Sequence, residues 1–143
     1  MNIHNRVLLY RIHNGSKVSI YIDKMIHNYI VVDHIDVDKN KLLLDKIVSS
    51  IGLEWDLNIK LISLKTDEGI VMDINNIKHS QTQFLIFGIS AEQLNIQYYP
   101  IVHHPLNFNR SIIHCSYSLN ELKENINYKK ALWNYFKTVS WNN

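Results

Sequence analysis

The sequence predicts an α/β fold: a three-layer-like sandwich built on a mixed sheet of four to five strands, in a single domain over residues 1–143. The segment Gln83–Ile89 is almost continuously apolar, which is typical of a strand buried on both faces. Leucines and isoleucines at helical spacing precede it, and helix-start signals follow it at Ser90 and Ser118. Helix patterns that alternate with strand patterns favour a sheet covered by helices.

The N-terminal region predicts a β-hairpin. Val7–Ile12 and Val18–Ile22 are rich in β-forming residues, and the Asn14-Gly15 pair between them is a strong short-range hairpin signal. Tyr29–Ile35 could add a third strand. An alternative is that residues 1–37 form an extension attached to a domain that is largely complete without them.

The first helix is expected to start near Lys39, with Asp38 as its cap, and to end at Gly52. Its apolar stripe is formed by Leu42, Leu43, Leu44, Ile47, Val48 and Ile51.

A strand is then expected over Asn58–Leu64. The polar segment Thr66–Gln81 is predicted to be a loop with one short element around Val71–Ile74. Ser90 and Gln93 have the form of a capping box, in which the serine accepts from the backbone and the glutamine reaches back.

The helix opened by Ser90 is expected to cover only Ala91–Leu94. The segment Ile96–Val102 is predicted to be a strand, with Pro100 favouring a sheet edge or a strand end. In that strand Tyr98 and Tyr99 would point to opposite faces.

Another strand is predicted over Ser111–Ser116. Ser118 and Glu121 form a second capping box, and one or two helices then fill Leu119–Val139, with a break near Asn125–Asn127.

Composition excludes several classes of function. The net charge is +2 and the positive residues are scattered, so strong direct nucleic-acid binding is not expected. The single Cys115 excludes an intrachain disulfide and suits a reducing cytoplasm. No leader-like segment and no run of 18 apolar residues is evident, so we expect neither a signal peptide nor a membrane span.

The search for catalytic chemistry is negative. His103-His104 and His114-Cys115 are the tight pairs, and neighbours on a strand point to opposite faces, so neither pair easily supplies two ligands to one ion. We expect partly exposed histidines on a sheet edge or loop, and Cys115 as a small buried hydrophobe. The glycines are too dispersed for a phosphate cradle, and no nucleophile elbow is present. No catalytic residue, cofactor or metal is therefore predicted, and the chain is not expected to be an enzyme.

The last predicted helix is rich in aromatic residues. Leu132, Tyr135 and Phe136 share one face, whereas Trp133 lies about 100° around the helix from Leu132. Trp133 can therefore widen the core stripe or face a second body. Trp141 follows the helix and is expected to be more exposed.

Three segments together resemble one family. Ile47–Trp55 (IVSSIGLEW) looks like the psi-subunit motif of bacterial DNA polymerase III, in which a helix ends in leucine-glycine-isoleucine before a tryptophan; here the tryptophan comes one residue early. Phe84–Ser90 is similar to the psi central strand and the turn after it. Lys130–Phe136 resembles the alanine-leucine-tryptophan signature of the psi C-terminal helix. The segments occur in the family's order, over residues 42–137.

This resemblance implies a noncatalytic accessory subunit of the clamp loader. Psi binds the chi subunit, which contacts single-strand-binding protein, and psi attaches chi to the clamp-loader collar. The positions that match the collar contact are Ile51, Leu53 and Trp55, and Trp133 matches the C-terminal signature. Whether Trp55 and Trp133 lie in the core or at an interface stays open at this point.

Two other interpretations remain. One is an unrelated small α/β protein-interaction or immunity-type protein that inhibits a partner. The other is a small His-dependent hydrolase or nuclease that uses the region of His103, His104, His114 and Cys115. Protein partners are expected under the first two hypotheses, and cytoplasmic localisation under the psi-like one.

Overall fold

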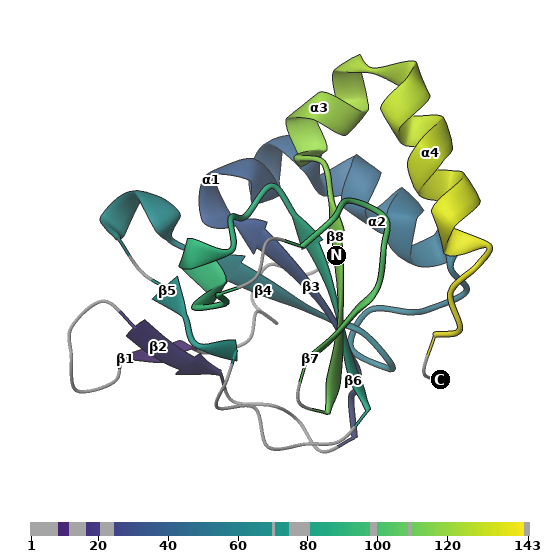
Figure 1. Cartoon of the computed structure of the whole chain (residues 1–143). Coiled ribbons are helices and arrows are strands. Elements are labelled where there is room, and N and C mark those ends of the chain that lie inside the picture. Colours follow the sequence, from purple (N-terminus) through teal and green to yellow (C-terminus); the bar gives the residue numbers. More distant parts are fainter. Residues whose placement is uncertain are drawn as a thin grey trace.

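A computed structural model describes residues 9–11, 17–20, 25–69, 71–74, 81–97, 100–108 and 110–141. Its larger sheet has five strands, and their spatial order is β4-β3-β6-β8-β7 (Figure 1). The first four are parallel, and β7 is antiparallel to β8. This confirms the predicted α/β class and the mixed sheet. In chain order the strands are β3 (Asn28–Asp33), β4 (Lys60–Leu64), β6 (Thr82–Phe87), β7 (Leu106–Phe108) and β8 (Ser111–Ser116).

A smaller sheet contains the predicted hairpin strands. β1 (Leu9–Arg11) pairs antiparallel with β2 (Lys17–Ile20), as the Asn14-Gly15 signal predicts, although the turn itself lies outside the described residues. β2 pairs in parallel with β5 (Val71–Met72), which is the short element expected in the loop between β4 and β6.

β3 is a central strand, because it pairs with β4 on one side and with β6 on the other. Its apolar residues Tyr29–Val32 are buried on both faces. The alternative in which residues 1–37 are an extension is therefore wrong for residues 28–37. The strand also ends two residues earlier than expected, because the carboxylate of Asp33 accepts from the Ile35 amide and begins a helix.

The first helical region differs from the prediction at its start. Asp33 caps α1 (His34–Val37), a 3₁₀ turn η2 (Asp38–Asn40) follows, and α2 (Lys41–Ser50) completes the region. Asp38 is not the cap, because the backbone is already helical when it reaches this residue. Gly52 ends the region as predicted, with the positive φ of 75° that glycine adopts readily.

The connections on either side of β6 each contain a short 3₁₀ turn. A 3₁₀ turn η3 (Thr66–Glu68) follows β4, and a second one, η5 (Glu92–Leu94), follows β6. Ser90 and Gln93 exchange the two hydrogen bonds of the predicted capping box. The predicted short helix is therefore present as a 3₁₀ turn.

The strand predicted over Ile96–Val102 is wrong: Ile96, Gln97 and residues 100–102 are irregular, and Tyr98 and Tyr99 lie outside the described residues. Positive φ values at Asn95 and His103 bound this segment on both sides, and Pro100 within it cannot donate to a ladder. The edge strand forms later, as β7.

The C-terminal part follows the prediction closely. β8 has the predicted bounds, and Ser118 and Glu121 form the complete capping box of α3 (Leu119–Glu124). Asn125 then breaks the helix and caps α4 (Ile126–Phe136) by accepting from two backbone amides.

The three layers consist of helices, the larger sheet, and a cover of small elements. The helices pack against the sheet face that carries Ile30, Val32, Leu85 and Phe87. The other face is covered by β5, η5 and the segments beside them. Along the sheet, the chain moves from β3 to β4 in one direction and then from β4 back past β3 to β6 in the other. Because such crossovers are right-handed, the two connections lie on opposite faces of the sheet. Figure 1 shows α2 and α4 on the same side of the sheet.

Candidate functional site

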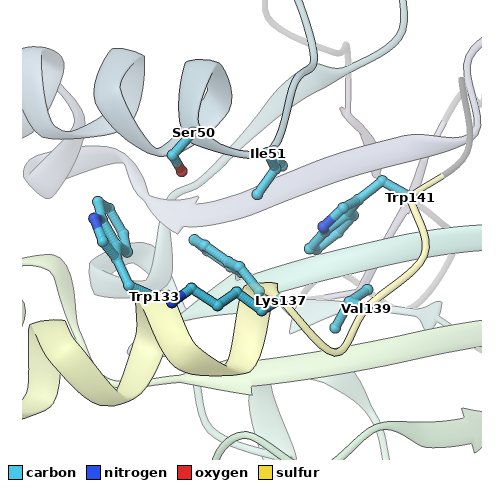
Figure 2. Close-up of a pocket in the computed structure, with 7 residues that line it drawn as sticks. Ser50, Ile51, Trp133, Lys137, Val139 and Trp141 are labelled. Carbon is cyan, nitrogen blue, oxygen red and sulfur yellow. The ribbon is translucent and has the colours of Figure 1, made fainter.

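A groove of about 330 Å³ lies where the end of α2 meets the end of α4. We call this site the aromatic groove, and Figure 2 shows most of its side chains around one hollow. Its volume is at the lower end of the range of ~300–1,000 Å³ that is typical of small-molecule pockets. It is therefore large enough for one or two side chains of a bound partner. The lining residues are Ser50, Ile51, Trp133, Phe136, Lys137, Val139 and Trp141.

Helix geometry explains why α4 supplies aromatic walls. Leu132, Tyr135 and Phe136 are buried against the sheet, and Trp133, rotated about 100° from Leu132, is half-buried at the margin of that core. The Trp133 ring lies 5.5 Å from the Phe136 ring. Trp141 meets Phe136 edge-on, with ring centroids 5.8 Å apart. The three rings therefore form a continuous aromatic surface between core and solvent.

The structure separates the four residues predicted to bind a partner. Ile51 and Trp133 come from motifs far apart in the sequence, and both line the aromatic groove. Leu53 is buried in the helix-side core, with 6% of its surface exposed. Trp55 is half-buried, and its indole Nε1 donates to Asp45 Oδ1 at 2.9 Å. The groove thus brings together two of the four residues, while partner contact through Trp55 stays a prediction.

A buried chain of hydrogen bonds lies beside the groove. Gln83 Nε2 donates to the Ser140 carbonyl at 2.7 Å, which turns Gln83 Oε1 toward His114 Nε2, 2.7 Å away. Because that oxygen can only accept, Nε2 of His114 carries the proton. The other nitrogen, Nδ1, then accepts from the Tyr135 hydroxyl at 2.5 Å.

The protonation states fit this direction. Burial lowers the pKa of His114 to about 4, which keeps the imidazole neutral. Burial, with a smaller contribution from Cys115, raises the pKa of Tyr135 to about 12, which keeps its hydroxyl a donor.

This chain of hydrogen bonds holds one wall of the groove. Gln83 fixes the carbonyl of Ser140, which lies between Val139 and Trp141 in the sequence. The Trp141 ring lies 5.3 Å from the His114 ring. Contacts within the chain therefore hold the segment after α4, and with it the groove wall that it forms.

The predicted histidine environments need one correction. His114 is not a partly exposed edge residue: it is 2% exposed, because β8 is an interior strand covered by α4. His103 is half-buried in a turn and His104 is exposed. Cys115 is buried as predicted, and burial raises the pKa of its thiol to about 11.

His103 Nε2 lies 2.9 Å from Ser116 Oγ, a distance at which a base can act on a serine. Among the described residues no carboxylate hydrogen-bonds the His103 ring, which instead stacks on Tyr135. Burial and His104 both lower the pKa of His103. In the described part of the chain, no group of three or more His, Cys, Asp or Glu residues is placed to hold a metal ion.

The usual ligand position of an open α/β sheet is at the carboxyl ends of the strands where the strand order reverses. Here that point lies between β3 and β6. Thr66 donates its hydroxyl to Asp33 after β3, and Ser118 packs against Gly88 after β6. Both strand ends therefore make contacts within the chain at this point.

The sequence pattern does not place Phe136, Val139 and Trp141 at a shared site, because their meeting with Ile51 depends on tertiary packing. The hydrogen bond between Gln83 and His114 was not predicted either. The available signal was a polar residue, Gln83, at the start of an otherwise apolar central strand, since buried polar groups are normally hydrogen-bonded.

Comparisons of the chain with family models, curated proteins and solved structures found no match. None of the helices in the described segments has the length and apolar character needed to cross a bilayer.

Proposed function

We propose that this chain is a noncatalytic accessory subunit resembling DNA polymerase III psi, which links the clamp loader to a chi-like partner that contacts single-strand-binding protein. The observation that supports this proposal is the meeting of Ile51 and Trp133 on the aromatic groove. Each belongs to a separate psi-like segment. Their placement on one half-buried surface supports a shared binding role for the two segments.

The groove has the physical character of a protein-binding site. Binding energy at protein interfaces is concentrated in a few aromatic and apolar anchors that sit in pockets. Trp133 and Trp141 are only half-buried, although they pack against the core, so part of each ring remains available to a second surface. The hydrogen-bonded segment at Ser140 fixes one wall, which lowers the ordering cost of binding.

The test is an affinity purification of the tagged chain from extracts of its own cells, read by mass spectrometry. The wild-type chain, Trp133→Ala and Trp55→Ala are compared with Leu42→Ala, which removes a side chain that is 85% exposed on α2 and does not line the groove. We expect clamp-loader or chi-like subunits with the wild type and Leu42→Ala, and their loss with Trp133→Ala. Loss with Trp55→Ala as well would extend the contact to that residue.

Circular dichroism must show that each variant is folded. Recovery of a single toxin-like enzyme in place of replication proteins would favour the immunity-type alternative. Failure of the folded wild type to recover any replication subunit would refute the psi-like role.

A further inference from the structure

We propose that the occupant of the aromatic groove is a peptide segment of a partner protein that carries a bulky apolar side chain flanked by acidic residues. This inference rests on the proposed binding function and adds the chemistry of the partner. The groove volume of about 330 Å³ supplies the first part, because it accommodates an anchor side chain and not a whole domain.

The charge around the groove supplies the second part. From Ile126 to Trp141 the chain carries three lysines, Lys129, Lys130 and Lys137, and no aspartate or glutamate. The chain as a whole has a net charge of only +2, so this segment is a local concentration of positive charge. Electrostatic complementarity at this position therefore favours a negatively charged partner surface over a positively charged one.

The lysines are placed at the rim of the groove. Lys130, Trp133 and Lys137 follow one another at spacings of three and four residues, which puts them on one stripe formed by α4 and its helical cap residue Lys137. On the other wall, Lys46 lies one turn before Ser50 on α2. Lys46, Lys130 and Lys137 are exposed.

No carboxylate in the described residues forms an ion pair with these three lysines. Asp45, the acidic residue of α2, accepts the indole hydrogen bond of Trp55. The three ammonium groups therefore remain available to an acidic partner, and their positive potential would repel a basic one.

The indole of Trp141 adds an independent observation. Its Nε1–H is shielded from solvent and has no acceptor among the described residues. Figure 2 shows the nitrogen-bearing edge of this ring turned toward Ile51, on the inner side of the groove. A buried donor without an acceptor is unfavourable. A carboxylate or carbonyl oxygen of a bound segment would satisfy this donor if binding displaced the groups that cover it.

The test uses the full chain and three fluorescein-labelled synthetic peptides, with binding followed by fluorescence anisotropy. The first peptide has a central phenylalanine flanked on each side by aspartate and glutamate. The second carries lysine at the four acidic positions, and the third has alanine in place of phenylalanine. We expect only the first to bind measurably, and its affinity to fall as salt is added.

Two variants test the contacts. Trp133→Ala should weaken binding of the first peptide roughly thirtyfold, as for truncation of a central aromatic anchor. The double variant Lys130→Glu/Lys137→Glu, which changes only exposed side chains and so should fold normally, should weaken it about tenfold. Leu42→Ala should leave the affinity unchanged.

Equal or tighter binding of the lysine peptide, or no effect of the double variant, would overturn the inference. Absence of binding by all three peptides would also overturn it, and a concentration-dependent dimer in sedimentation would then identify a second copy of the chain as the occupant. The affinity purification could also recover a replication subunit that depends on Trp133 but binds without an acidic segment. That result would support the proposed function and refute this inference.

Discussion

Lowering the pH should destabilise the fold through His114. This imidazole is buried and neutral, with a pKa lowered to about 4 from 6.5 by burial. In the unfolded chain it binds a proton as the pH falls through 6.5, whereas in the folded chain it does so only near pH 4. Between these values the unfolded state holds more protons, so the free energy of unfolding falls as the pH falls.

The size of the effect follows from the two pKa values. A tenfold difference in proton affinity corresponds to about 1.4 kcal/mol, so the difference between 6.5 and about 4 corresponds to about 3 kcal/mol. That amount is a large fraction of the ~5–15 kcal/mol typical of a domain. His103, whose pKa is also lowered, contributes in the same direction.

Urea unfolding measured from about pH 7 to about pH 4 checks this value. His114→Gln is the matched variant, because it keeps a polar side chain but cannot titrate. We expect the wild type to lose about 3 kcal/mol more than the variant over this range. Parallel pH profiles for the two proteins would refute the reasoning, because His114 would then have the same proton affinity in both states.

Two further predictions concern glycines at positive φ and the buried thiol of Cys115. Gly88→Ala should destabilise the fold by about 2 kcal/mol or more, because an added Cβ would lie 2.7 Å from Ser118 Cβ at a φ of 68°. The control Gly52→Ala, at a φ of 75° with open space around it, should destabilise the fold by only about 1 kcal/mol. Equal losses of stability in thermal unfolding would contradict this account. Cys115 should react with a thiol reagent at neutral pH only after denaturant is added, because it is buried and its pKa is raised to about 11; rapid reaction of the native protein would show that β8 is accessible.

Elements with strong local signals were predictable from the sequence. The capping box at Ser118 fixed the start of α3, and Asn125 explained the break before α4. The apolar run in β6 indicated a central strand before its neighbours were known. In each case the residues that determine the element lie within a few positions of one another, so the local sequence is enough to predict it.

Features that depend on distant contacts were not predictable in the same way. β3 and β6 have similar apolar patterns, but only the pairing of β3 with β4 on one side and β6 on the other shows that β3 is central. β7 is short and partly polar, and it is a strand because β8 pairs with it. The aromatic groove likewise exists because the end of α2 meets the segment after α4. The individual psi-like motifs contained Ile51 and Trp133 but not their proximity.

The most direct test of the binding role is photo-crosslinking inside the cell. A benzoylphenylalanine residue is introduced in place of Lys137 at the groove, or in place of Leu42, which is 85% exposed and does not line the groove. If the aromatic groove binds a partner, a defined protein, identified by mass spectrometry as a clamp-loader or chi-like subunit, should crosslink from position 137 and not from position 42. The same crosslinks from both positions, or none from position 137, would contradict the account.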